Sequence, residues 1–353
     1  MLRKLVTGSL FFLLLLAGCA TTVTPRPEIE GRALLEERNI QRKIALEQNI
    51  KDSSRIQDVG FPLLQAAVSF CGPNVVESIG LDVATSYDFE ESFQRAAQEA
   101  LATSASVTVM NAIDGGPSAV AGIQSKDTIL AVNGNPIVTG ANASAIFSNL
   151  LKEELDSNDS IVLSIDREGA SIDFEVSSVD VCDYNISLVL TDDLNAYADG
   201  SNVYITRRML RFTDSDKELA LVIAHELAHN IMNHVRKRRQ NYSLGLLVDL
   251  AARSQGIDTS GLFRDMTADA YSQAFEAEAD YVGMYILART GMDLDGAIYF
   301  WRRMAVESPS NIDSHSSSHP ATAERFLALE QAIVEIAEKK AAGISLNPET
   351  KSD

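Results

Sequence analysis

The N-terminal third of the chain changes its pattern of apolar and polar positions several times. Leu10 to Leu16 is an apolar run, residues 20 to 27 are rich in Thr and Pro, and Glu28 to Ile50 is charged with sparse apolar positions. The last of these predicts a helical stalk behind a spacer. Apolar residues return from Phe61 to Ser86, and Phe89 to Ala102 has the periodicity of a helix. We therefore expect a stalk followed by the start of a folded body.

Short alternating segments follow and predict strands. Val107, Val109 and Ala112 alternate with polar residues, and a second strand over Thr128 to Val132 ends at an Asn-Gly turn. Further strands are expected at Ile161 to Ile165, Ser171 to Val176, Ile186 to Thr191, Asn195 to Ala198 and Asn202 to Thr206. This region is thus expected to be mostly β-structure.

A long apolar helix is expected after these strands. Ser215 and Glu218 form a capping-box pattern, and the four cations from Arg236 to Arg239 suit the C-terminal end of a helix. We predict one helix over about Ser215 to Arg239. Because its interior positions are almost all apolar, it should be buried.

Composition narrows the classes of function. The 353 residues are 46% hydrophobic, which is typical of globular domains, and the formal net charge is -19. Such acidity disfavours contact with nucleic acid and with anionic lipid head groups, so we expect no nucleic-acid partner.

The first residues have the organisation of a secretory signal peptide. Arg3 and Lys4 precede the apolar run, and Leu16-Ala17-Gly18-Cys19 is a small-residue cleavage site. The run is too short to span a bilayer, so cleavage is favoured over a permanent anchor. The Leu-Ala-Gly-Cys sequence resembles the bacterial lipobox, which implies lipidation of Cys19. Ala20 after it implies the outer membrane as destination.

Two cysteines remain once Cys19 is assigned to lipid. Export would place Cys71 and Cys182 in an oxidising compartment, where a pair of thiols tends to close. We predict a Cys71–Cys182 disulfide bond. Two buried free cysteines are the alternative.

The predicted strands between residues 100 and 180 resemble a PDZ domain of the type that accompanies bacterial proteases. The resemblance rests on the order of a Gly-Gly-Pro turn at Gly115, an Ala-Gly pair ending at Gly122, Asp127, Ile-Leu and Asn133-Gly134. It implies that a peptide adds to a sheet edge. Residues 102 to 105 lack the usual glycine-rich carboxylate loop, so the domain could bind internal peptides or act as a spacer.

The predicted buried helix contains the candidate chemistry. His225, Glu226 and His229 form an HExxH pattern, in which two imidazoles one turn apart can bind one zinc ion. Glu276 is the candidate third ligand, and Asp280, four residues later, would accept the free ring N–H of a ligand histidine. We expect Glu278 to be solvated. For His234 we expect a core contact or a contact with a metal ligand.

These motifs resemble the zinc metallopeptidase family of CAAX prenyl endopeptidases and HtpX-like proteases, of the gluzincin type. The resemblance covers residues 183 to 335 and includes Ser318-His319-Pro320, Arg325, and Asn195-Ala196 as a substrate-facing edge strand. No later apolar run reaches the roughly 18 residues of a membrane span. The chain is therefore most similar to the soluble periplasmic branch, that of the beta-barrel assembly-enhancing proteases.

The resemblance implies metal-assisted peptide hydrolysis. Glu226 would take a proton from water and deliver it to the leaving amine. His319 or Arg325 could stabilise the oxyanion, or His319 could occupy the open metal position and keep the enzyme latent.

We therefore predict an α+β chain, with a mainly helical peptidase that has a small sheet and is interrupted by a PDZ-like domain. The expected order is a signal peptide (1–18), an anchored spacer and stalk (19–60), the first part of the peptidase body (61–99), the PDZ-like domain (100–181), the peptidase domain (182–342) and a disordered tail (343–353). With one zinc ion per chain it would degrade misfolded or misassembled envelope proteins. The alternative is a chaperone or adaptor lipoprotein that binds unfolded peptides.

Overall fold

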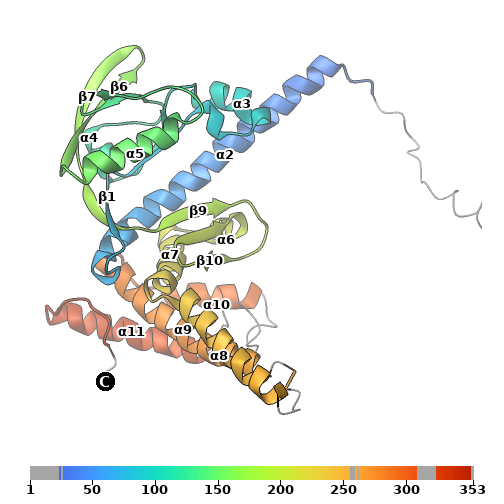
Figure 1. The fold of residues 1–353 in the computed structure, drawn as a ribbon, viewed down its shortest axis with the longest axis vertical. Helices are drawn as coiled ribbons and strands as arrows, with labels where there is room; N and C mark the ends of the chain where they lie inside the picture. Colours follow the sequence, from blue (N-terminus) through green and yellow to red (C-terminus); the bar gives the residue numbers. More distant parts are fainter. Residues whose placement is uncertain (1–23, 25–26, 255–258, 261, 308–322, 351–353) are drawn as a thin grey trace, which may run out of the picture. The chain divides into compact units, whose positions relative to one another are not determined.

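The fold in Figure 1 is that of a computed structural model that describes residue 24 and residues 27–254, 259–260, 262–307 and 323–350. The chain divides after Gln41 into two compact units. The regular structure described in the first unit is the beginning of helix α2, which spans Gly31–Ala66. No helix in the described ranges is long and apolar enough to cross a membrane.

Helix α2 is longer than the stalk predicted over Glu28 to Ile50. It begins with exposed apolar side chains such as Leu35, whereas Leu46, Ile56 and Leu63 are buried. The first residues of the apolar stretch that indicated a folded body, Phe61 to Ala66, therefore continue the same helix. Within the second unit, the C-terminal half of α2 is part of the hydrophobic core.

The PDZ-like part is built on a six-stranded antiparallel sheet. Its strands follow the order β2-β3-β4-β6-β7, with β5 paired to β4, and α5 packs against this sheet (Figure 1). The sheet buries its own apolar cluster, which includes Val109, Phe147 and Leu163. Its elements are η2 (Ser86–Asp88), α3 (Glu91–Leu101), α4 (Pro117–Ala121), α5 (Ala143–Leu155), β2 (Leu81–Ala84), β3 (Thr108–Ala112), β4 (Thr128–Val132), β5 (Asn135–Pro136), β6 (Ser160–Arg167) and β7 (Ala170–Ser177).

This sheet starts earlier in the chain than predicted. Strand β2 pairs with β3, with Leu81 opposite Ala112, although we expected residues 61–99 to belong to the peptidase body. A strand of four half-buried residues has too little periodicity to reveal its partner.

The segments just before and just after the six-stranded sheet pair with each other in a two-stranded sheet. Strand β1 (Val75–Ser78) pairs antiparallel with β8 (Val179–Cys182), with Val75 opposite Cys182. Next to it, after η1 (Val68–Phe70), Cys71 and Cys182 form a disulfide bond with their Cα atoms 5.8 Å apart. Both ends of the PDZ-like part are therefore fixed at one place.

The peptidase part is mainly helical and has one small sheet. The sheet order is β10-β11-β9, antiparallel between β10 and β11 and parallel between β11 and β9. Helix α7 packs against this sheet and against α9. The elements are β9 (Asn185–Val189), β10 (Ala196–Ala198), β11 (Asn202–Thr206), α6 (Arg207–Phe212), α7 (Asp216–Ile231), α8 (His234–Ser254), α9 (Leu262–Arg289), α10 (Ala297–Glu307) and α11 (Ala323–Ala341).

The described part of the C-terminal tail is attached to the helices. Lys339 Nζ donates to the carbonyl oxygen of Asn347 at 2.8 Å, and the Glu349 amide donates to the Tyr281 hydroxyl at 2.9 Å. Leu346 packs against the core. The disorder predicted for residues 343–353 is therefore not what the structure shows up to residue 350; residues 351–353 lie outside the described residues.

Candidate metal centre

Helix α7 positions the HExxH residues. The Ser215 hydroxyl caps it by accepting from the Glu218 amide at 3.3 Å, and acidic residues in the first turn suit the positive end of the helix dipole. The side chains of His225, Glu226 and His229 are buried in spite of their polarity. Buried polar groups of this kind need partners, and the neighbouring elements supply them for the two histidines.

Helix α7 ends at Ile231, so the single helix predicted from Ser215 to Arg239 is wrong. Asn233 has φ +57°, and Asn tolerates this left-handed conformation better than most residues, which lets the chain turn and begin α8 at His234. The turn brings His234 Nδ1 to 2.9 Å from His229 Nδ1. His234 therefore contacts a candidate metal ligand, which was one of the two expectations for it.

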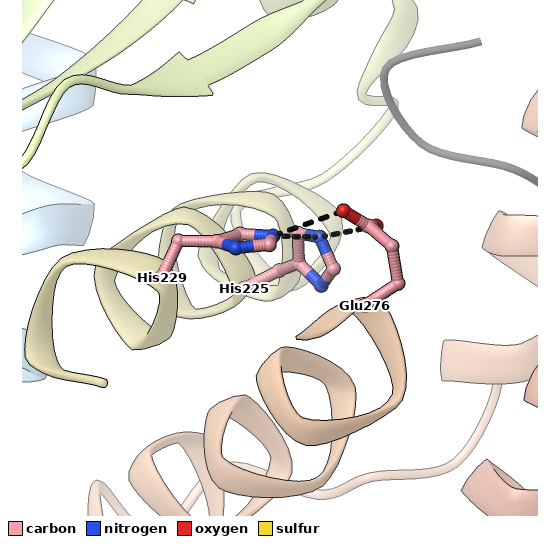
Figure 2. A group of neighbouring side chains, drawn as sticks. All are labelled: His225, His229 and Glu276. Carbon is pink, nitrogen blue, oxygen red and sulfur yellow. Dashed lines mark hydrogen bonds and ion pairs between the residues drawn. The ribbon is translucent and has the colours of Figure 1, made fainter. Parts of the chain in front are cut away.

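Glu276 reaches the two imidazoles from α9, as Figure 2 shows. The Nε2 atoms of His225 and His229 lie 3.2 Å apart, and the nearest Glu276 oxygens are 3.4 Å and 3.3 Å from them. Ligand atoms on a tetrahedral zinc ion with bonds of about 2.0–2.1 Å lie about 3.3–3.4 Å apart. The spacing of the three groups therefore fits one zinc ion.

Asp280 and Arg325 hold this arrangement in place through contacts with the candidate ligands. Asp280 Oδ1 lies 2.9 Å from His225 Nδ1, so this ring nitrogen donates and Nε2 faces the ligand cluster. Arg325 binds both Asp280 oxygens, through Nε at 2.7 Å and Nη2 at 2.9 Å, and its Nη1 is 3.3 Å from Glu276. The two buried carboxylates are thereby fixed in place.

The charges of the site fit a divalent cation. Burial opposes protonation of His225, but hydrogen bonds to Asp280 and Glu276 outweigh it and raise its pKa to about 10. Burial lowers the pKa of His229. For Asp280, burial opposes ionisation, but the Arg325 charge and the bond to His225 hold its pKa below the usual value. The carboxylates thus favour positive charge between the imidazoles, where a metal ion would lie.

Several predicted residues have other surroundings than expected. Glu278, expected in solvent, pairs with His234 Nε2 at 2.8 Å, because the turn at Asn233 brings that ring to α9. Arg325, considered as an oxyanion donor, is bound to the carboxylates described above. His319 and Cys19 lie outside the described residues.

The proposed substrate strand lies at a sheet edge. Strand β10 starts at Ala196 and occupies the end of the order β10-β11-β9, and it packs against α7. The Asn195 carbonyl, just before it, accepts from the Thr206 amide at 3.2 Å and the Thr206 hydroxyl at 2.7 Å. The backbone leading into this edge is therefore fixed.

Trp301 is a residue of the site that the sequence did not reveal. It lies on α10 with its ring 5.3 Å from that of His225, and the Arg325 guanidinium is 5.8 Å from its centre. The only sequence feature that could have drawn attention to this residue is that it is the single Trp of the chain. It covers the apolar side of His225.

Comparison with known families agrees with this geometry. Residues 168–333 match the model of peptidase family M48, and residues 78–177 match a PDZ domain model. One region of the chain is thus similar to M48 peptidases and another to PDZ domains. These matches confirm the resemblance to the metallopeptidase family and to PDZ domains, and the mixed α+β class. The PDZ match begins before β2, in agreement with the pairing of β2 and β3 in the PDZ-like sheet.

Curated relatives are similar to part of the chain. The chain is 29% identical over 142 residues to the beta-barrel assembly-enhancing protease of Yersinia pestis, which covers 35% of this chain and 29% of the relative. It is 28% identical to the mitochondrial metalloendopeptidase OMA1 of Schizosaccharomyces pombe, covering 40% of this chain and 44% of the relative. The chain is 29% identical to the metalloprotease LoiP of Escherichia coli, and the match covers 40% of this chain and 59% of the relative. Each match spans less than two thirds of the relative.

Proposed function

We propose that this chain is a zinc-dependent endopeptidase of the bacterial cell envelope. The observation that carries the proposal is the convergence of His225, His229 and Glu276 at tetrahedral spacing, with Glu226 beside them on α7. A purely structural zinc site has no use for a buried glutamate next to its ligands. The similarity to M48 peptidases supports the same reaction.

The roles of the chain's own residues follow from their positions. When bound, zinc supplies Lewis-acid polarisation and lowers the pKa of water to about 7. Glu226 takes the proton from the attacking water and delivers it to the leaving amine. Asp280 keeps His225 in the tautomer whose Nε2 binds metal, and Arg325 holds Asp280 in place. Trp301 limits access of water beside His225.

We infer that the substrate is an extended polypeptide. An edge strand offers backbone hydrogen bonds to a peptide of any sequence, and β10 lies at such an edge next to α7. Unfolded or misassembled envelope proteins expose extended backbone of this kind, which makes them the proposed substrates. The relatives named as beta-barrel assembly-enhancing proteases favour this class.

The PDZ domain and the N-terminus complete the proposal. The PDZ domain would recognise or present peptides, because this fold binds them at a sheet edge. Cys19, in its lipobox-like sequence, would be lipidated and hold the protein at the inner leaflet of the outer membrane.

The substitution Glu226→Gln tests the reaction. Purified wild-type protein should contain one zinc ion per chain and cleave an unfolded protein such as reduced casein. The variant should keep the zinc and lose roughly 10²–10⁴-fold in rate, because the general base is removed. Glu338→Gln, at an exposed glutamate on α11, is the control and should leave both unchanged.

Two results would contradict this function. One is wild-type protein without stoichiometric zinc. The other is full rescue of a deletion strain by Glu226→Gln, which would favour a peptide-binding adaptor.

A further inference from the structure

Helix α8 exposes apolar side chains and buries an acidic one. The exposed residues are Tyr242 (43% exposed), Leu244 (61%), Leu247 (62%), Val248 (47%) and Leu250 (51%). Asp249, between two of them, is only 7% exposed and accepts a hydrogen bond from the Thr259 hydroxyl. A helix with solvent around it has the opposite arrangement. This inversion indicates that the outer face of α8 lies against an apolar medium.

The same helix carries the densest cluster of cations in an acidic chain. Arg236, Lys237, Arg238 and Arg239 lie in the first turns of α8, and its remaining Asp, Glu, Lys and Arg side chains are Asp249 and Arg253. Cations at a helix N-terminus are disfavoured by the helix dipole. Arg236, Arg238 and Arg239 are exposed, and among the described residues none of the three forms an ion pair. Their position at the N-terminal end therefore does not stabilise the helix. It indicates an anionic partner outside the chain.

The charge pattern decides between two occupants of this face. A second copy of the chain, packed through the same face about a two-fold axis, would offer these cations no acidic partner from α8, because the one carboxylate of that helix, Asp249, is buried. An anionic phospholipid surface would instead match both features, because its phosphates attract the arginines and its acyl region accepts the leucines. The net charge of -19 does not prevent this, since charges beyond about 8–10 Å are screened at physiological salt.

We propose that α8 is a docking surface for anionic phospholipid membranes. The exposed side chains from Tyr242 to Leu250 enter the boundary between head groups and acyl chains, and Arg236 to Arg239 bind the phosphates. Helix α8 lies in the interface and does not span it, because no described helix is apolar enough to cross a membrane. This surface is separate from the acyl anchor proposed at Cys19 and would orient the peptidase part on the membrane.

Site-specific tryptophan fluorescence tests the docking. The full chain with Leu247→Trp is mixed with vesicles of phosphatidylglycerol and brominated phosphatidylcholine, whose bromine atoms quench only an inserted indole. Its matched control is Leu327→Trp, at an exposed apolar position on α11 (58% exposed). The native Trp301 is buried and is the same in both variants. We expect loss of emission at position 247 and no loss at 327.

A charge variant tests the role of the cations. Replacing Arg236, Arg238 and Arg239 by Gln in the Leu247→Trp chain should weaken partitioning to these vesicles by roughly a hundredfold, and vesicles without phosphatidylglycerol should have the same effect. Leu244→Trp serves as a second probe. Equal quenching at 247 and 327 would overturn the proposal, because an N-terminal anchor alone would explain it. No quenching at 244 and 247 would also overturn it, as would a concentration-dependent emission change without vesicles, which would indicate a second copy.

Discussion

At the scale of residues, the site depends on the groups behind the three candidate ligands as much as on the ligands themselves. His225 has Asp280 at its Nδ1, and His229 has His234 at its Nδ1. Each ring is therefore held with Nε2 toward the other ring and toward Glu276. Partners of this kind set the tautomer and the orientation of a metal-binding imidazole.

The substitution Asp280→Asn should weaken zinc binding by about 10–100-fold, because an amide neither fixes the His225 tautomer nor balances the Arg325 charge. Competition titration with a zinc chelator measures this affinity. Asp295→Asn, an exposed carboxylate before α10, should bind zinc like the wild type. If both variants keep the wild-type affinity, Asp280 has no part in the site.

At the scale of elements, the close approach of α7 and α9 brings the ligands together. Gly283 on α9 makes this possible: a Cβ atom there would lie 3.1 Å from the Ala224 oxygen and 3.2 Å from the His225 nitrogen. Both are backbone atoms of the helix that carries the imidazoles, so they cannot rotate away. A side chain at 283 would therefore push α9, with Glu276 and Asp280, away from α7.

The substitution Gly283→Ala tests this contact. Helix propensity alone would favour Ala by about 1 kcal/mol, whereas overpacking costs typically about 1–3 kcal/mol. We expect a net loss of stability in urea unfolding together with weaker zinc binding. Gly31→Ala, where nothing lies within 4 Å of the added Cβ, should cause neither change. A Gly283→Ala protein more stable than wild type would show that the helices are not in tight contact.

At the scale of the whole molecule, the second unit connects the PDZ-like part to the peptidase part in two ways. The disulfide between Cys71 and Cys182 closes a loop around the PDZ sheet, with 111 residues of sequence separation. Helix α2 also contacts both parts: Arg55 binds Asp216 at the start of α7 at 2.8 Å, and Gln57 binds Asp82 of β2 at 3.1 Å. Changes in the PDZ sheet therefore have a direct structural route to the helix that carries the candidate ligands.

The double substitution Cys71→Ser, Cys182→Ser should lower the free energy of unfolding by about 2–4 kcal/mol, since closing a loop of about 100 residues restricts the unfolded chain. Urea unfolding measures the loss. Reducing agent should lower wild-type stability to that of the variant and leave the variant unchanged. Wild-type protein with the same unfolding midpoint with and without reducing agent would contradict a stabilising role.

The sequence alone determined the features that depend on local spacing. His225 and His229 share a helix face because they are one turn apart, and Glu276 and Asp280 are placed together for the same reason. The strands of the PDZ sheet follow from alternation, apart from β2 and β5, which are too short to show it. The cysteine pair followed from a count of the three cysteines.

Only the tertiary structure decided which distant groups meet. The left-handed turn at Asn233 brings His234 back to His229, and Arg325 reaches Asp280 across 45 residues of sequence. The turn also moved the cations of residues 236–239 from the expected end of one helix to the beginning of the next, beside the exposed leucines of α8. Periodicity specifies the face of an element, but the partner of that face depends on contacts between segments that are far apart in the chain.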